Sequence, residues 1–362
     1  MNYLGSAGLL IALFLSGCDT KVEEPKSFVP EFTDYNAVSR NPKFECVQEL
    51  DRLQNISPHE DAFYQYGRHL SQVRGPKDFD QIARYYRIAA AYGDYRAARS
   101  LQALLIQGKT TTERPAEEAI GLVKHLLAHG NPRGYYDMGL YLESGYGVQK
   151  DSSAARYYVR RAADLGNPEA QFLTAKSLLQ SSKNSFIALS MLRCAMGQGS
   201  VDAANLYFEI SAHKDNHEQA LLALRTATKF GDVESASALA STDYASGLER
   251  DSRMFNPDER VEGDRRYKLI ARFLTRYKNL DPQVLDIDEI VPLPPTKLPV
   301  WDETFQWKRA RDAAITPLAP SKLTINEMSR RKDLNPTTGL RLSSLRLKLK
   351  AIRKKLQWRS WD

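Results

Sequence analysis

The histidines are the residues of this sequence with the most obvious capacity for chemistry. His125 and His129 lie four residues apart in a predicted helix, so both imidazoles face the same side. His213 and His217 repeat this spacing across a predicted loop. Such a pair binds a metal ion when further Cys, His or carboxylate ligands lie close by. No Cys, Asp or Glu cluster of suitable spacing accompanies either pair, so we interpret all four as packing or surface residues and predict neither a metal site nor a cofactor.

Other catalytic motifs are absent from the sequence. It contains no nucleophile-elbow serine, no glycine-rich loop ending in lysine, and no catalytic set of Cys and His. Gly145 and Gly147 form a Gly-x-Gly pair, but this pair follows a predicted helix and no strand, so the dinucleotide-binding interpretation is disfavoured. We therefore predict that the protein is not an enzyme and that it acts by binding.

The elements that position these residues are clearest between Tyr135 and Leu173. Gly145 and Gly147 interrupt one helical pattern, because glycine adopts backbone angles that other residues reach only at a cost. Asp151 can cap a second helix, and Gly166 ends it. One face of the second helix carries apolar residues at spacings of three and four, with small ones where a neighbouring helix must come close. These residues are Ala155, Tyr158, Ala162 and Ala163.

This stretch resembles a Sel-one-like repeat, a relative of the tetratricopeptide repeat. The resemblance is carried by Gly139, Tyr141, Gly145, Gly147, Val148, Asp151, Ala155, Tyr158, Ala162, Ala163, Gly166 and Ala170. It implies an all-α fold, an alpha-alpha solenoid of stacked helix pairs that binds other proteins and has no catalytic residues of its own. Because each pair buries its apolar face only against its neighbours, the pairs must stack into a curved rod with a concave side.

The same pattern recurs along the chain. Glycines that end a helix and precede a capping residue are spaced by 37, 36, 33 and 32 residues, the range of helix-pair solenoids; they are Gly93, Gly130, Gly166, Gly199 and Gly231. Small residues follow them by four positions, namely Ala97, Gly134, Ala170, Ala203 and Ser235. Apolar residues follow by seven or eight, namely Leu101, Met138, Leu173, Leu206 and Leu239. We predict about six helix pairs from Asp61 to Tyr277, with a long insert at residues 248–264 in the last.

Composition and charge narrow the classes of partner. The chain has 362 residues, of which 42% are apolar and 26% charged, as in ordinary globular proteins. Its formal charge of +7 comes from residues 341–362, which contain eight Lys or Arg and one Asp. The other 340 residues carry 43 basic and 43 acidic side chains, so the body of the protein shows no sign of nucleic-acid binding.

The first residues resemble a bacterial lipoprotein signal. Residues 4–15 form an apolar run too short to span a bilayer, and it leads into the sequence Leu-Ser-Gly-Cys that ends at Cys18. The resemblance implies cleavage before Cys18, acylation of its thiol and attachment to a lipid membrane, each buried methylene contributing roughly 0.8 kcal/mol. Asp19 favours the inner membrane, with the outer membrane as the alternative. One departure is that no Lys or Arg precedes the apolar run, and an uncleaved apolar terminus is the alternative interpretation.

Two further cysteines, Cys46 and Cys194, remain after Cys18. A periplasmic location would permit a disulfide between them, but the sequence does not establish that they meet. Cys194 occupies a small, buried position in a predicted helix. We therefore interpret Cys194 as a packed free thiol.

After Asn279 the helical period stops. Prolines crowd the next residues and favour an extended path; they are Pro292, Pro294, Pro295 and Pro299. We expect Trp301, Phe305 and Trp307 to be buried along the solenoid, where they attach the C-terminal segment to the last repeat. The alternative is a recognition surface for a protein partner that includes Trp301, Asp302 and Trp307, with Tyr146 of the glycine loop as a further candidate. A short helix is predicted over residues 323–332.

The end of the chain forms a basic amphipathic pattern. Leu345, Leu349, Ile352 and Leu356 recur at spacings of four, three and four, as in an amphipathic helix. The basic face, with candidate partner contacts at Arg353, Lys354, Lys355 and Trp358, has three interpretations. It could bind anionic lipid, meet an acidic protein, or close the solenoid with a solvated outer face.

These patterns divide the chain into five parts. They are a signal peptide (residues 1–17), a tether (18–43), a Sel-one-like solenoid (44–278), a Pro- and Trp-rich extension (279–339) and a basic helix (340–362). Lipid-anchored proteins of similar design include immunity proteins that neutralise periplasm-acting effectors of type VI secretion, notably phospholipases. The resemblance therefore implies a periplasmic immunity protein that binds one protein partner, a toxin or effector. The alternative is a periplasmic scaffold or regulatory adaptor for envelope assembly.

Overall fold

The computed structural model describes residues 43–342, except for 54, 181–183, 242–256 and 294. A short 3-10 helix, η1 (Glu49–Arg52), precedes the repeats. The helices of the repeat region are α2 (Pro58–Gln72), α3 (Phe79–Ala91), α4 (Tyr95–Ile106), α5 (Pro115–Ala128), α6 (Pro132–Ser144), α7 (Ser152–Asp164), α8 (Pro168–Leu178), α9 (Ser185–Gly197), α10 (Val201–His213), α11 (His217–Lys229), α12 (Val233–Leu239) and α14 (Pro257–Tyr277). They are followed by η3 (Lys278–Leu280), α15 (Ile287–Ile290), α16 (Gln306–Ala313) and α17 (Lys322–Arg331).

Local sequence signals set the helix ends as predicted. Gly145 ends α6 in the left-handed conformation, with φ of 77°. The side chain of Asp151 accepts hydrogen bonds from the backbone N–H groups of Ser153 and Ala154 and so caps α7. Asn167 caps α8 through the N–H of Ala170. Each cap satisfies donors that would otherwise lack a partner in the first turn of a helix.

Each helix packs against the next one along the chain, which gives six consecutive pairs within the described residues. The prediction of an all-α solenoid of stacked helix pairs is confirmed; the described residues contain one isolated bridge, between Leu334 and Arg341, and no strand. The sixth pair consists of α12 and α14. The predicted insert at 248–264 is too long, because Pro257 already begins α14.

The small residues predicted to lie four positions after each helix-ending glycine are close-contact positions. Ala97, Ala170 and Ala203 are fully buried. The predicted apolar ridge is less regular in two repeats, because Leu173 and Leu206 are only partly buried. The residue after Leu206, Tyr207, is the one that enters the core. In this repeat the residue eight positions after the glycine, and not the one seven positions after it, enters the core.

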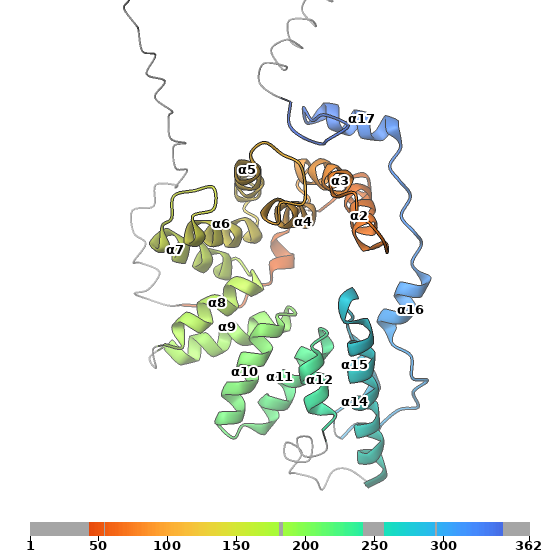
Figure 1. The fold of residues 1–362 in the computed structure, drawn as a ribbon. Coiled ribbons are helices and arrows are strands. Elements are labelled where there is room, and N and C mark those ends of the chain that lie inside the picture. The colour runs from red at the N-terminus through yellow and green to blue at the C-terminus, as the bar shows by residue number, and fades with distance from the viewer. Residues whose placement is uncertain (1–42, 54, 181–183, 242–256, 294, 343–362) are drawn as a thin grey trace, which may run out of the picture.

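The C-terminal extension joins the last helix pair to the first (Figure 1). The repeats follow a curve from α2 round to α14, and α16 and α17 cross its open side. Helix α17 packs on the first repeats, where the side chains of Ile325, Met328 and Leu334 share a core with α3 and α4. The hydroxyl of Tyr92 donates a hydrogen bond to the carbonyl oxygen of Met328 at 3.0 Å. The extension therefore closes the curve of the solenoid.

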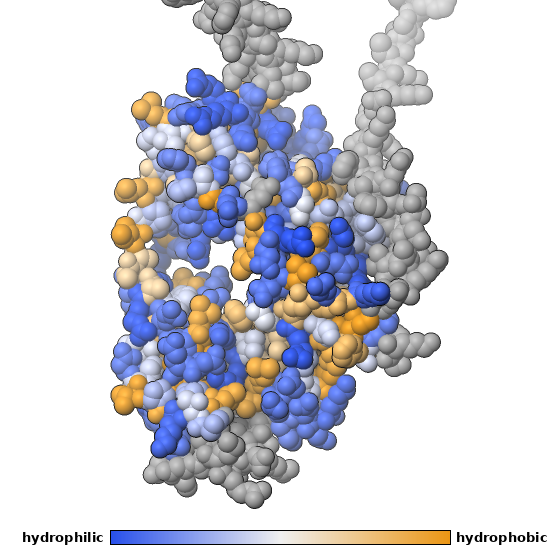
Figure 2. Space-filling model, turned by 180° about the vertical axis from the view of Figure 1, so that it is seen from behind, coloured by the Kyte–Doolittle hydropathy of each residue, from blue (hydrophilic) through white to orange (hydrophobic). Residues whose placement is uncertain are grey.

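The closed curve leaves an opening through the middle of the molecule when it is viewed from behind (Figure 2). The segment between α16 and α17 exposes large apolar side chains, with Ile315 90% and Leu318 88% accessible.

Within the described residues, none of the helices combines the length and the apolar character that crossing a bilayer requires.

Candidate protein-binding site

The predicted aromatic residues of the extension lie in a cluster with α14. The ring of Phe305 stacks on that of Phe273 with centroids 3.9 Å apart. Trp301 contacts Phe305 edge-on at 5.5 Å, and Trp307 contacts Phe273 in the same way at 5.8 Å. Phe305 is buried, whereas Trp301 and Trp307 are partly buried. The two tryptophans therefore attach the extension to the last repeat, and neither stands out as an exposed anchor.

Asp302 forms a tight turn at the surface. Its carboxylate accepts hydrogen bonds from the backbone N–H of Thr304 at 3.0 Å and from the Thr304 hydroxyl at 2.6 Å. These hydrogen bonds lower the pKa of Asp302 below its usual value. Trp301 closes the same turn by donating from Nε1 to the carbonyl oxygen of Thr304 at 3.0 Å. Asp302 thus orders the turn that precedes α16 and keeps its side chain 69% exposed.

Tyr146 and the tail candidates lie away from this cluster. Tyr146 of the glycine loop packs against Tyr141 of α6, with ring centroids 5.3 Å apart. It is partly buried against the core formed by the first three helix pairs. The remaining predictions, on Arg353, Lys354, Lys355, Trp358 and the acylated Cys18, lie outside the described residues.

The histidine pair His125 and His129 lies on one side of α5, with ring centroids 4.5 Å apart. Nδ1 of His129 lies 2.7 Å from the carbonyl oxygen of His125 and bonds to it when that nitrogen carries the proton. Among the described residues no group of three or more His, Cys, Asp or Glu could hold a metal ion.

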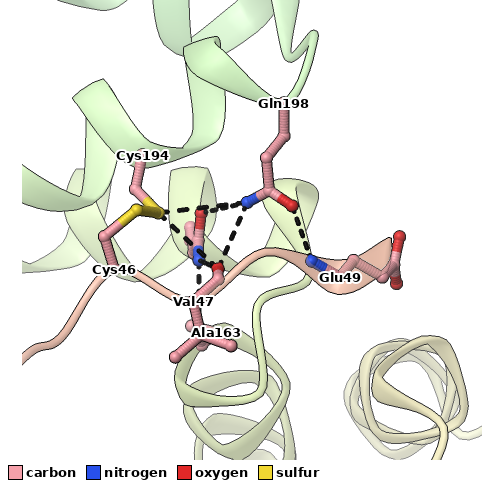
Figure 3. Close-up of a disulfide and its surroundings, with 7 residues drawn as sticks. Cys46, Val47, Glu49, Ala163, Cys194 and Gln198 are labelled. Atoms are coloured by element: carbon pink, nitrogen blue, oxygen red, sulfur yellow. Dashed lines mark hydrogen bonds between the residues drawn. A yellow bond between two sulfur atoms is a disulfide. The ribbon is translucent and has the colours of Figure 1, made fainter. Parts of the chain in front are cut away.

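The interpretation of Cys194 as a free thiol is wrong. Cys194 in α9 forms a disulfide with Cys46, and the Cα atoms lie 5.6 Å apart (Figure 3). The bond attaches residues 43–53 to the repeats across a separation of 148 residues. Gln198, one turn after Cys194, accepts a hydrogen bond from the backbone N–H of Glu49 at 2.7 Å. The small, buried setting of Cys194 is as typical of a half-cystine as of a free thiol, so the local pattern could not distinguish them.

The segment attached by this disulfide places η1 on the inner side of the curve (Figure 1). Gly166 allows the segment to come close, since a Cβ at this position would lie 2.7 Å from the backbone carbon of Gln48. The carboxylate of Glu49 accepts a hydrogen bond from Asn167 at 2.8 Å. Burial raises the pKa of Glu49, and this hydrogen bond opposes the shift.

Charged side chains connect α4, α6 and α8 beside this segment. Arg133 of α6 pairs with Asp137 at 3.1 Å and with Glu169 of α8 at 2.6 Å, and Arg99 of α4 lies 3.7 Å from Glu169. Asp137 also accepts a hydrogen bond from Gln102 at 3.2 Å. Burial raises the pKa of Asp137, and the charge of Arg133 opposes that shift. The acids and bases of this surface satisfy one another, so it offers little uncompensated charge to a partner.

A different surface has uncompensated charge. A cleft of about 440 Å³ lies between α14 and α16 and is lined by residues that include Arg272, Arg276, Phe273, Tyr277, Phe305 and Arg309. We call it the α14–α16 cleft. The arginines of α14 in this cleft were not predicted from the sequence, although their spacing of four on one helix indicates that they share a face.

A family model for a domain of unknown function, DUF6396, matches residues 235–342, which include α14, the extension and the cleft. No curated protein matches the chain in sequence.

Among solved structures, the fold is similar to that of three proteins of Pseudomonas aeruginosa. They are immunity protein Pa5087 (TM-score 0.54, 23% identity), immunity protein PA5088 (TM-score 0.53, 22% identity) and PA5086 (TM-score 0.51, 24% identity). In each case the match covers 70% of this chain and 95% of the other. At these identities the likeness concerns the fold alone, a solenoid of stacked helix pairs.

Proposed function

We propose that this protein is a lipid-anchored immunity protein of the periplasm, which neutralises an antibacterial effector by binding it directly. The observation that carries the proposal is the fold shared with Pa5087 and PA5088, both described as immunity proteins, over 70% of this chain. An effector delivered by type VI secretion, with a phospholipase as the favoured kind, fits the predicted position at the membrane that such a toxin attacks.

Two features of the molecule support this mode of action. The disulfide between Cys46 and Cys194 suits an oxidising compartment such as the periplasm. The C-terminal extension closes the solenoid, and a disulfide cross-links its N-terminal segment. Its surface is therefore ordered before a partner binds. A preordered surface loses less conformational entropy on binding and so favours tight complexes.

A competition experiment tests the proposed immunity. Cells that lack this gene are grown with sister cells that deliver effectors, and the deletion strain should be killed until the gene is restored. The effector whose removal from the attacker abolishes the killing should form a stable complex with the purified protein in gel filtration. The proposal fails if the deletion strain survives every effector produced by its own kind.

The anchor is tested separately. Cys18→Ser removes the predicted acylation site and should release the protein from the membrane fraction while its folded part still binds the effector. Protection should fall, since tethering keeps a binder at high effective concentration where the effector acts. If the Cys18→Ser variant stays in the membrane fraction, the prediction of a lipid anchor at Cys18 is wrong. The proposal that the protein binds an effector is not affected by that result.

A further inference from the structure

Two basic side chains of the α14–α16 cleft have no acidic partner among the residues that the structure describes. The carboxylates on its edge are already engaged: Glu303 pairs with Arg265 at 2.7 Å, and Asp312 pairs with Lys308. Arg272 and Arg276 are exposed and form no ion pair with any residue in the described part of the chain. The cleft therefore presents two neighbouring guanidinium groups with free donors.

The spacing of these two arginines suits a pair of carboxylates. On an α-helix, side chains four residues apart have Cβ atoms roughly 5–6 Å apart, which is close to the separation of alternate side chains on one face of an extended peptide. A guanidinium group binds a carboxylate through two parallel hydrogen bonds. An extended segment with acidic residues at alternate positions can therefore reach both arginines.

The cleft also has an apolar floor, made by the rings of Phe273, Tyr277 and Phe305. Such a floor can accept an apolar side chain next to the acidic ones. Arg311 of α16 lies over the rings of Tyr277 and Trp307, at 5.7 and 5.6 Å from their centroids. The combination of aromatic side chains and arginine is typical of the residues that dominate protein interfaces.

Buried polar contacts hold the two walls of the cleft in place. Asp286 is only 5% exposed and accepts a hydrogen bond from the backbone N–H of Gln306 at 2.8 Å, at the beginning of α16. Arg266 of α14 donates to the carbonyl oxygens of Ile290 and Pro299, at 2.7 Å each. The walls are therefore fixed before a ligand enters, which lowers the entropic cost of binding.

From these observations we infer that the α14–α16 cleft binds an acidic, partly apolar segment of a protein partner. A phosphate or lipid headgroup fits less well, because Arg272 and Arg276 lie one turn apart on α14, a spacing that suits two separate carboxylates better than a single anion. The inference rests on the proposed function in one respect: the partner that supplies this segment is the effector.

The binding experiment uses the full chain and a fluorescein-labelled peptide of twelve residues in which Glu and Leu alternate. We expect saturable binding by fluorescence anisotropy, weakened by salt, and a loss of roughly ten- to hundredfold in affinity for R272E/R276E. K176E/R193E is the matched control, with the same change in net charge at exposed positions on α8 and α9, and it should bind as the wild type does. Melting curves should verify that both variants fold, and R272Q/R276Q provides a milder test.

Three results would overturn the inference. The first is equal binding of the peptide by R272E/R276E and by K176E/R193E. The second is equal affinity for a peptide with Gln in place of Glu. The third is absence of peptide binding together with binding of inorganic phosphate, or of vesicles containing phosphatidylglycerol, that R272E/R276E loses.

The competition experiment separates this inference from the immunity proposal. If the wild type and R272E/R276E protect cells equally, the inference fails and the immunity proposal stands. If the wild type gives no protection, immunity fails, and the peptide measurement still decides whether the cleft binds acidic segments.

Discussion

Gly139 shows how a single residue sets the distance between two helices. A Cβ at this position in α6 would lie 2.7 Å from Cγ2 of Val159 and 3.1 Å from the carbonyl oxygen of Ala155, both in α7. A larger side chain must push α7 away, and overpacking of this kind costs about 1–3 kcal/mol. We expect Gly139→Val to lower the free energy of unfolding by at least that amount in urea denaturation.

Gly121 is the matched control for this substitution. It lies in α5, and a Cβ there would meet nothing within 4 Å. Gly121→Ala should be neutral or stabilise the protein by up to about 1 kcal/mol, because alanine favours the helix. Equal effects of the two substitutions would contradict the role of close approach at Gly139.

His125 is the residue at which stability should depend on pH near neutrality. It faces His129 of its own helix and, from the C-terminal segment, Lys332 and Arg341. Burial lowers its pKa, and these neighbouring charges lower it further. A histidine with a lowered pKa in the folded state binds protons more readily when unfolded, so its contribution is fully favourable above about pH 6.5 and declines as the pH falls below that value.

The corresponding prediction compares two pH values. Between pH 7.5 and 5.5 the wild type should lose thermal stability, and His125→Gln should lose less, because it removes the group that the unfolded state protonates. His59 provides the control, since it is exposed at the start of α2. Identical pH profiles for His125→Gln and the wild type would exclude this role of His125.

At the level of structural elements, the attachment of the N-terminal segment to the repeats depends on the disulfide between Cys46 and Cys194. Residues 43–53 lie before the first repeat and make few apolar contacts of their own, with Phe44 packed against the core that α9 and α10 share. The bond between Cys46 and Cys194 restricts the unfolded chain over a separation of 148 residues. Cross-links over loops of this length stabilise proteins by roughly 2–5 kcal/mol.

We therefore expect Cys46→Ser/Cys194→Ser to reduce the free energy of unfolding by about 2–5 kcal/mol in guanidinium denaturation under non-reducing conditions. Dithiothreitol should destabilise the wild type by a similar amount and leave the double variant unaffected. The prediction is wrong if the variant and the non-reduced wild type unfold at the same denaturant concentration.

At the scale of the whole molecule, Arg87 joins the first repeats to the C-terminal segment. Its guanidinium group pairs with Glu118 of α5 at 2.6 Å and donates to the carbonyl oxygen of Thr338 at 3.1 Å. The side chain of Arg87 is only 5% exposed. Gly339 allows this approach, since a Cβ there would lie 2.8 Å from Cβ of Arg87.

Arg87→Met should loosen the closure of the solenoid. Glu118 would keep its charge without its partner, and breaking a buried pair in this way costs about 3–5 kcal/mol. Hydrogen exchange should accelerate in residues 322–342 more than in α9 to α11. Arg331→Met is the control, because its pair with Glu327 is exposed and worth about 0.5 kcal/mol or less. Unchanged exchange in 322–342 would show that other contacts suffice for closure.

Short-range patterns in the sequence were sufficient to predict the local structure of this protein. Capping residues such as Asp151, helix-ending glycines such as Gly145, and alanines on one face of α7 act within a few residues of their own position, so their spacing revealed the helices, their pairing and the solenoid. The packing of the aromatic residues of the extension was predicted for the same reason. Helices α15 and α16 were not predicted, because short helices among prolines have little periodic pattern.

The features that join distant parts of the chain could be found only from the three-dimensional arrangement of the helices. The disulfide of Cys194 and the docking of α17 on α3 depend on how far the stacked pairs turn, whereas α14 meets α16 because the extension folds back on the last repeat. That turn is the sum of small rotations at every interface. Because no local spacing encodes such a sum, the sequence could predict a curved solenoid but could not reveal its closure.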